Sequence, residues 1–303
     1  LHSNIFKKHE LSKSVIGTGK TIKNITAKDL RKYHKEHYVL PNIKLLIIGN
    51  YPNKIHNTIK TLFSIKSTPY SFKQSEFNYI GKTPKVIFKK KTNQEQTCVL
   101  IAFPTTHFND KEKYVLEFLS SYLSDGMSSV LFYELRDKNS LVYSIKSNQT
   151  SYHKSGFFNI ATCLKEFNVE KAIKIIFREL KKLKTLNISK KDLTKCKNLI
   201  KGNININNDN LENIAEYYTY QILYGDEIIN FNKLFKLIDK ITIEDVKNVA
   251  NKYFDFNKIH VFGNGGSASI ASHFSMYVQE DWNKSAQFVI FLRFLQTHTF
   301  ARK

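Results

Sequence analysis

The sequence has few residues that interrupt regular secondary structure, with 11 Gly and 5 Pro among 303 residues. This scarcity excludes a collagen-like or linker-rich protein. No stretch reaches the roughly 18 consecutive apolar residues of a membrane-spanning helix. The longest candidate, Ala286 to Leu295, carries Arg293. With 42% hydrophobic residues, the chain can build one large or two ordinary domains, and we expect a soluble protein.

Cysteine is scarce as well, being found only at Cys98, Cys163 and Cys196. An odd number of cysteines without CxxC spacing predicts neither a disulfide framework nor a cysteine zinc site. We therefore expect a reducing compartment, such as the cytoplasm or a mitochondrial matrix. The sequence begins at Leu1 without a recognisable signal peptide, so we expect that its N-terminus is incomplete.

The charge is strongly of one sign, at +21, yet arginine is rare. Only five of the 47 basic residues are Arg, and the lysines are spread along the whole chain. A surface that binds phosphates normally gathers Arg and aromatic residues on one face. The composition therefore argues against nucleic acid as a partner.

Hydrophobic periodicity predicts an α+β fold of helices packed with an antiparallel or mixed sheet. Thr26 with Asp29, and Thr242 with Asp245, are typical of helix N-termini. Helices are expected at 26–38, 54–63, 111–123, 129–137, 169–186, 190–206, 211–224 and 242–253. Strands are expected at 43–48, 85–90, 96–103, 142–149, 156–164 and 258–262.

A polar stretch at 66–83 contains Pro69 and lacks periodicity, which predicts a linker. It would separate the end of a first domain, 1–65, from a second domain, 84–262, which is followed by an extension at 263–303. The end of each domain shows the same pattern of a helix closing on a Tyr, a short loop and an apolar run. These two copies lie at 38–48 and 253–262.

Short motifs mark both predicted domains. They are Ile16-Gly17-Thr18, Thr21-Ile22, Ile25-Thr26, Tyr38-x-x-Pro41-Asn42, Gly126-Met127-Ser128-Ser129, Leu135-Arg136, Leu141-Val142-Tyr143-Ser144 and Gly156-Phe157-Phe158. Together they resemble the insulinase/pitrilysin family of zinc metallopeptidases, whose halves each contain two homologous α+β domains. The resemblance implies one partial domain and one complete, non-zinc domain.

The family's inverted zinc motif, HxxEH, and its later Glu ligand are absent. His34 and His37 stand three residues apart on a predicted helix, which is the wrong spacing, and ordinary helix-end residues explain them as well. We therefore expect no cofactor in this chain and no hydrolysis by it alone. The resemblance implies zinc in a full-length protein or in a partner subunit.

Arg136 and Tyr143 match the residues with which the family's non-zinc half binds the substrate backbone and the developing oxyanion. The resemblance thus implies proteolysis of a peptide or unfolded protein, completed by a homologous zinc-bearing subunit or a homodimer. The predicted strand from Val142 to Gln149 could hold such a peptide at a sheet edge. The alternative is a non-catalytic assembly subunit of the same fold, in which Arg136 and Tyr143 are ordinary surface and core residues.

A second resemblance follows the last predicted strand. The phosphate-binding candidates are Gly263, Asn264, Gly265, Gly266, Ser267 and Ser269. They resemble the phosphate loop of sugar-isomerase domains such as phosphoheptose isomerase, because a glycine loop opening a helix offers N–H groups to an anion. That family carries a carboxylate where this chain has Tyr277, and too little sequence follows for a complete domain of that fold. A Gly/Ser turn before a tail helix is the simpler alternative.

Overall fold

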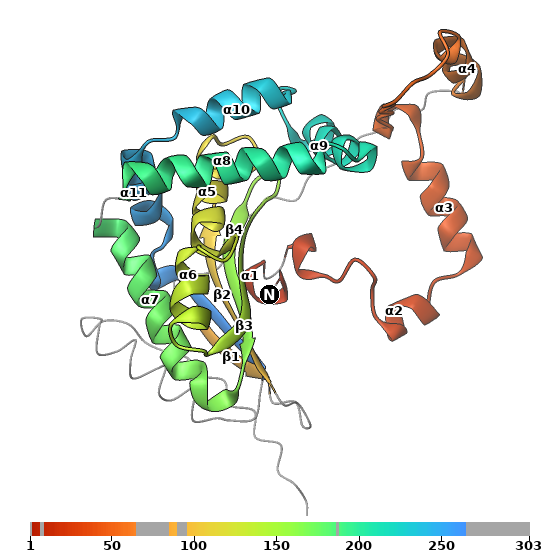
Figure 1. Cartoon of the computed structure of the whole chain (residues 1–303). Coiled ribbons are helices and arrows are strands. Elements are labelled where there is room, and N and C mark those ends of the chain that lie inside the picture. The colour runs from red at the N-terminus through yellow and green to blue at the C-terminus, as the bar shows by residue number, and fades with distance from the viewer. Residues whose placement is uncertain (1, 7–8, 65–84, 90–95, 186–187, 265–303) are drawn as a thin grey trace, which may run out of the picture. The chain divides into compact units, whose positions relative to one another are not determined.

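The computed structural model describes residues 2–6, 9–64, 85–89, 96–185 and 188–264 (Figure 1). Two compact units emerge from these residues. One comprises 1–80 with 198–236, and the other comprises 81–197 with 237–303. Among the described residues, every helix is too short or too polar to span a bilayer.

The second unit is built on a five-stranded sheet in the order β1-β5-β2-β4-β3. Its strands are β1 (Lys85–Lys89), β2 (Thr97–Thr105), β3 (Val142–Ser151), β4 (Gly156–Leu164) and β5 (His260–Asn264). β1 and β5 run parallel, and every other neighbouring pair is antiparallel. β3 therefore lies at one end of the described sheet, next to β4 only.

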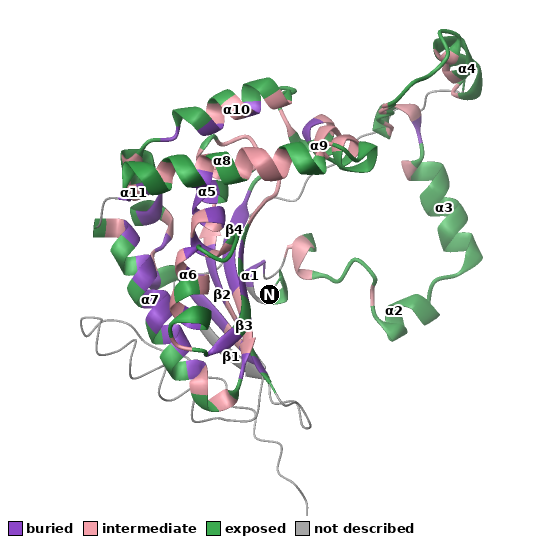
Figure 2. Cartoon of the chain, viewed as in Figure 1, coloured by how far each residue is buried: buried purple, intermediate pink, exposed green. Residues whose placement is uncertain are grey.

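Helices cover one face of this sheet. α5 (Glu112–Ser124), α7 (Val169–Thr185) and α11 (Ile243–Tyr253) form that layer, and the buried residues gather between helices and strands (Figure 2). Alternate residues of a strand share a face, so β2 directs Phe103 toward the helices. There the Phe254 ring lies 5.2 Å from the Phe103 ring and 5.1 Å from the Phe158 ring. This aromatic cluster is fully buried.

The connection from α5 to β3 contains α6 (Val130–Phe132) and a π-helical turn, Tyr133–Asp137. Two further helices belong to both units along the chain, because the unit boundaries fall within them. They are α8 (Lys190–Asn207) and α10 (Phe231–Lys240).

The described residues of the first unit contain no strand. Its α-helices are α1 (His2–Ile5), α2 (Gly19–Lys23), α3 (Ala27–His37), α4 (Ile55–Leu62) and α9 (Leu211–Tyr224), together with the end of α8 and the start of α10. At the corner between α9 and α10 the Tyr217 ring stacks on Phe231 at 4.6 Å, and the Tyr217 hydroxyl donates to the Ile229 carbonyl at 2.8 Å.

The α+β class is confirmed, and most predicted elements occur within two residues of their expected bounds. Thr26 and Thr242 both close capping boxes with the expected Asp29 and Asp245. Two strand predictions need correction. Residues 43–48 form no strand, because no described strand of their unit offers backbone partners, and the last strand runs to Asn264 instead of ending at Phe262.

The linker predicted at 66–83 lies outside the described residues. The compact units group 198–236 with the N-terminal part of the chain, a division that does not follow the predicted domain ranges. The ranges 1–65 and 84–262 stay a prediction.

Candidate functional site around Arg136 and Tyr143

The segment that carries Arg136 is fixed by buried leucines and a tight turn. Gly126 has φ +78°, a conformation that favours glycine, and its carbonyl accepts a hydrogen bond from the Ser129 hydroxyl at 2.8 Å. Leu131 and Leu135 are fully buried. The apolar side chains therefore anchor this segment to the core, while the intervening residues remain on the surface.

Glu134 ties the π-helical turn to α7. Its carboxylate accepts from Lys138 Nζ at 3.0 Å and from Arg178 Nη2 at 2.6 Å, and Arg178 Nε also donates to Glu179 at 2.7 Å. Burial raises the pKa of Glu134, but the hydrogen bonds from Lys138 and Arg178 outweigh it, so its pKa lies below the usual value. Arg178 is thereby neutralised by two carboxylates.

Arg136 contrasts with Arg178. Its guanidinium lies over the Phe132 ring at 4.7 Å, and the side chain is exposed. Within the described part of the chain it makes no ion pair. A planar cation supported by an aromatic ring and free of carboxylates is suited to binding carbonyl or carboxylate oxygens.

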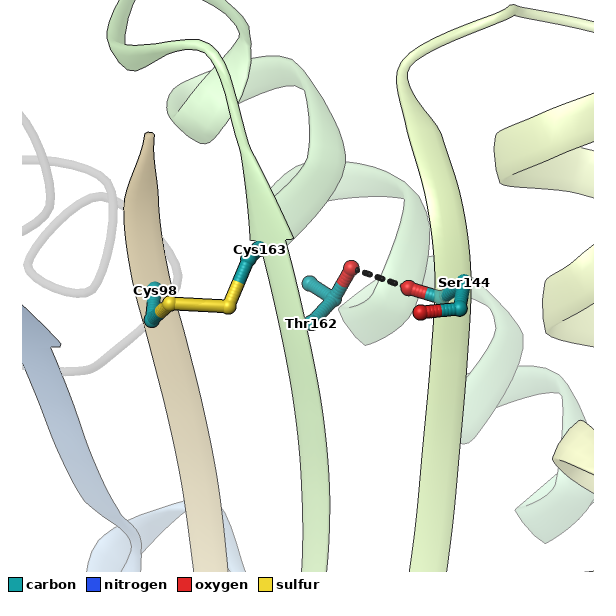
Figure 3. Close-up of a disulfide and its surroundings, with 4 residues drawn as sticks. All are labelled: Cys98, Ser144, Thr162 and Cys163. Atoms are coloured by element: carbon teal, nitrogen blue, oxygen red, sulfur yellow. Dashed lines mark hydrogen bonds between the residues drawn. A yellow bond between two sulfur atoms is a disulfide. The ribbon is translucent and has the colours of Figure 1, made fainter. Parts of the chain in front are cut away.

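Tyr143 lies in a β-bulge. Val142 pairs with Leu164 and Ile145 pairs with Thr162, so Tyr143 and Ser144 together stand opposite a single residue, Cys163. The Thr162 hydroxyl donates to the Ser144 carbonyl at 2.8 Å and fixes the bulge (Figure 3).

The Tyr143 side chain is 80% exposed, and its hydroxyl makes no hydrogen bond within the described chain. A hydrogen bond from the Leu141 N–H to the Leu135 carbonyl, at 2.8 Å, closes the turn between the π-helical segment and β3. Arg136 directly follows Leu135, and Tyr143 lies two residues after Leu141, so both residues flank this hydrogen bond in the chain. Both predicted residues therefore present unused polar groups from one anchored segment.

The outer edge of β3 is partly occupied. The Ser147 N–H donates to the Ser124 hydroxyl at 2.7 Å, and the Ser147 carbonyl accepts from the Ser120 hydroxyl at 2.6 Å. Hence α5 supplies hydrogen-bond partners for the backbone of β3 at the middle of the strand. Alternate residues of an antiparallel strand direct their backbone groups away from the partner strand, so Ile145 has the same orientation as Ser147. The part of the edge suited to receiving another strand is the end next to the bulge.

Comparison with known proteins identifies the family. The model of the family described as "Peptidase M16 inactive domain" matches residues 24–200. The chain belongs to this M16 family. An uncharacterized zinc protease of Rickettsia felis is 26% identical over 261 residues, covering 84% of this chain and 61% of the relative. A probable mitochondrial-processing peptidase subunit beta of Arabidopsis thaliana is 24% identical, covering 94% of this chain and 55% of the relative.

Among solved structures, a protease from Helicobacter pylori superimposes with a TM-score of 0.79 at 21% identity, covering 88% of this chain and 65% of that one. The M16 chain thus spans about 60% of the length of the curated relatives named above. The predicted insulinase/pitrilysin resemblance is confirmed at the level of family and fold.

The described residues of this M16 domain do not fit a zinc ion, because they contain no group of three or more His, Cys, Asp or Glu side chains that could hold a metal. The His34 ring stacks on Tyr38 at 4.6 Å, whereas the His37 ring lies against Tyr33 at 4.1 Å. We therefore derive no chemical step through zinc from these residues.

The cysteine prediction is wrong for this M16 domain. Cys98 and Cys163 form a disulfide between β2 and β4 (Figure 3), while Cys196 is a free, buried thiol. The two bonded cysteines are direct partners in the antiparallel register, with Cα atoms 4.0 Å apart. Nothing in the spacing of 65 residues signals this pairing, because only the strand register makes them neighbours. The reducing compartment stays a prediction.

The predicted phosphate loop is described only at its start. Gly263 and Asn264 are strand residues of β5, where they pair with Val99 and Cys98 of β2. The other four candidates, Gly265, Gly266, Ser267 and Ser269, lie outside the described residues. Phosphate binding by this loop stays a prediction.

Proposed function

We propose that this chain is the substrate-binding, non-zinc part of an M16 zinc endopeptidase. In this proposal Arg136 and Tyr143 bind an extended peptide or unfolded protein, and the zinc ligands are supplied by a homologous zinc-bearing subunit or segment. The supporting observation is the pair itself. A cation without a carboxylate partner and a phenol with a free hydroxyl are presented by one anchored segment.

The chemistry of the two side chains suits a peptide backbone. A carbonyl oxygen gains negative charge when it is attacked, and a guanidinium and a phenol O–H are donors that stabilise such charge. The segment is held by buried leucines and by the Glu134 ion pairs, so little ordering is needed when a ligand binds. An extended peptide would lie along the open end of β3, next to Tyr143.

Peptide binding is tested with the full chain and an unstructured, fluorescently labelled peptide, by fluorescence anisotropy. We expect Arg136→Ala to weaken binding about tenfold or more, because a charge-assisted hydrogen bond is lost. Tyr143→Phe should weaken it less, since only a hydroxyl is removed. Arg31→Ala and Tyr220→Phe are matched controls on exposed helical positions that lie outside the segment.

These controls separate specific binding from attraction to a chain of charge +21. Non-specific attraction would weaken equally in Arg136→Ala and Arg31→Ala, and it would fade as salt is added. Equal affinities for all four variants would refute the proposed role of the pair. Peptide hydrolysis, measured with zinc for this chain alone and mixed with a zinc-bearing subunit of the same family, should occur only in the mixture and be lost with Arg136→Ala.

A second candidate function is that of a non-catalytic assembly subunit, and one helix face favours it. Leu30 and Tyr33 of α3 are 60% and 58% exposed, and Ile22 of α2 is also exposed. Apolar side chains on one face of an amphipathic helix normally pack against another surface. We propose that a homologous subunit or a second copy of this chain covers them.

Sedimentation velocity of the full chain, alone and with a zinc-bearing family subunit, tests this contact. Leu30→Asp should weaken self-association or the mixed complex, whereas Lys35→Asp, on the same helix, is the control. A tight dimer without any peptide affinity would favour the assembly function over the peptidase function. A chain that stays monomeric and does not bind the zinc-bearing subunit would contradict the assembly function.

A further inference from the structure

The bulge that carries Tyr143 and the disulfide are adjacent in the sheet. Cys163 of β4 is bonded to Cys98 of β2 on one side, and on its other side it stands opposite Tyr143 and Ser144 of β3. Its chain neighbour Thr162 holds the Ser144 carbonyl (Figure 3). The disulfide and the bulge are thus separated by the width of a single strand.

We propose that Cys98 and Cys163 form a reversible thiol–disulfide site, reacting with small-molecule thiols and disulfides, whose redox state sets the geometry of the bulge that presents Tyr143. The effect on peptide affinity rests on the proposed function, whereas the redox site and its effect on the bulge do not. Three features of the sheet support a reversible site.

The strand register keeps the two thiols together when the bond is open. β2 and β4 pair continuously from Thr97↔Leu164 to Thr105↔Gly156, so the cysteines face each other whether or not they are bonded. β2 also pairs with β5 at Cys98 and Asn264. Reduction therefore leaves the sheet assembled, and the high local concentration of one thiol near the other favours oxidation again.

The pair is also accessible. The Cys98 side chain is exposed and Cys163 is partly exposed, while Cys196 is buried and its thiol lies 3.7 Å from the Phe118 carbonyl. Burial raises the pKa of Cys196 to about 12, which removes the reactive thiolate at neutral pH. Thiol–disulfide exchange is thus directed to Cys98 and Cys163, and Cys196 serves as an internal control.

Thiol–disulfide exchange forms the Cys98–Cys163 bond in two balanced steps. The Cys98 thiolate attacks one sulfur of a small disulfide, R–S–S–R, forming a mixed disulfide and releasing one RS⁻. The Cys163 thiolate then attacks the Cys98 sulfur, which forms the Cys98–Cys163 bond and releases the second RS⁻. The two protons lost by the cysteines are taken up by the two RS⁻ groups, giving two RSH. A small dithiol such as dithiothreitol reverses both steps.

Oxidation should hold β4 against β2 at the position opposite the bulge, so that Tyr143 is more firmly placed in the oxidised chain. A preorganised site binds more tightly because less ordering accompanies binding. We expect the oxidised chain to bind the labelled peptide about fivefold more tightly than the reduced chain, the lower end of typical coupling between two sites. Cys98→Ser should bind like the reduced chain under both conditions.

The test equilibrates the full chain with oxidised or reduced glutathione, followed by acid quenching, unfolding and alkylation with a maleimide. We expect one labelled thiol in the oxidised chain and three in the reduced chain. The oxidised chain should also show slower amide exchange at Tyr143 and Ser144, which stand opposite Cys163. The Cys196→Ser chain should still form the Cys98–Cys163 disulfide, and its amide exchange should still differ between the oxidised and reduced states.

Three labelled thiols after oxidation would overturn the redox site. One labelled thiol with identical amide exchange at Tyr143 and Ser144 in both states would overturn the effect of the disulfide on the bulge. If exchange differs but neither state binds peptide, the proposed function fails and the redox site stands. If both states bind peptide with equal affinity, the proposed regulation is refuted while the substrate-binding role survives.

Discussion

Replacing glycine by alanine at two positions, Gly156 and Gly202, tests the backbone packing of the structure. Gly156 opens β4, and a Cβ placed there would lie 2.1 Å from the Thr106 carbonyl oxygen and 2.7 Å from that of Thr150. Gly202 lies inside α8, and a Cβ placed there meets nothing within 4 Å. Alanine should therefore have opposite effects on stability at the two positions.

The magnitudes follow from these contacts. Ordinary contact begins at 3.4 Å, so the added Cβ comes too close to the Thr106 carbonyl oxygen by more than 1 Å and to the Thr150 carbonyl oxygen by less than 1 Å, and the backbone must move to accept it. Overpacking of this kind costs about 3 kcal/mol. Gly202→Ala should instead stabilise by about 0.5–1 kcal/mol, because alanine loses less backbone entropy in a helix.

Thermal unfolding followed by circular dichroism measures both effects. At about 2–4 °C per kcal/mol, Gly156→Ala should lower the midpoint by roughly 10 °C, and Gly202→Ala should raise it slightly. Amide exchange in β4 should accelerate only in Gly156→Ala. A Gly156→Ala chain that unfolds at the same temperature as the unsubstituted chain would refute the close approach of Gly156 to the Thr106 and Thr150 carbonyls.

Three further predictions concern the core, the ion pairs and the free thiol. Phe254→Ala should destabilise by about 3–5 kcal/mol in urea titrations, because the ring is fully buried between two others; a loss below about 1 kcal/mol would contradict the packing. Glu134 has a lowered pKa, so its contribution, of about 1 kcal/mol, is present above the pKa of an unfolded Glu and is lost as pH falls through the folded pKa. The difference in unfolding midpoint between Glu134→Gln and the unsubstituted chain should thus vanish in acid, and a difference that persists there would exclude this origin. Cys196, whose pKa burial raises to about 12, should resist alkylation at pH 8 until the chain unfolds; mass spectrometry would reveal any label on the folded chain.

Local sequence signals were sufficient for most helices and strands. Thr26 and Thr242 each close a capping box at the expected helix start, because a capping box involves only residues three apart. β4 occupies the predicted range, since its apolar residues and bounding turns are local signals too. α10 was not predicted, although Leu234 and Ile238 recur at helical spacing and could have revealed it.

The candidate site was only partly visible in the sequence. The family resemblance pointed to Arg136 and Tyr143, but it carried no information on which arginine is free. Arg178 is neutralised by carboxylates from two elements, whereas Arg136 is not, and ion pairs between elements cannot be read from spacing. The serines of α5 that occupy the edge of β3 are equally invisible, because their partner lies more than 20 residues away.

The two copies of the helix, Tyr and apolar run separate what local sequence determines from what tertiary contacts determine. Both copies have a capped helix and a similar apolar run, which the sequence determines because these features depend on neighbours a few residues apart. Only the run at His260–Asn264 became a strand, since β1 and β2 supply its backbone partners. The same dependence on distant partners placed Cys98 beside Cys163 and set the bulge at Tyr143. The sequence alone thus determined most helices and the family, whereas distant partners decided which apolar run became a strand and the strand register decided which residues meet.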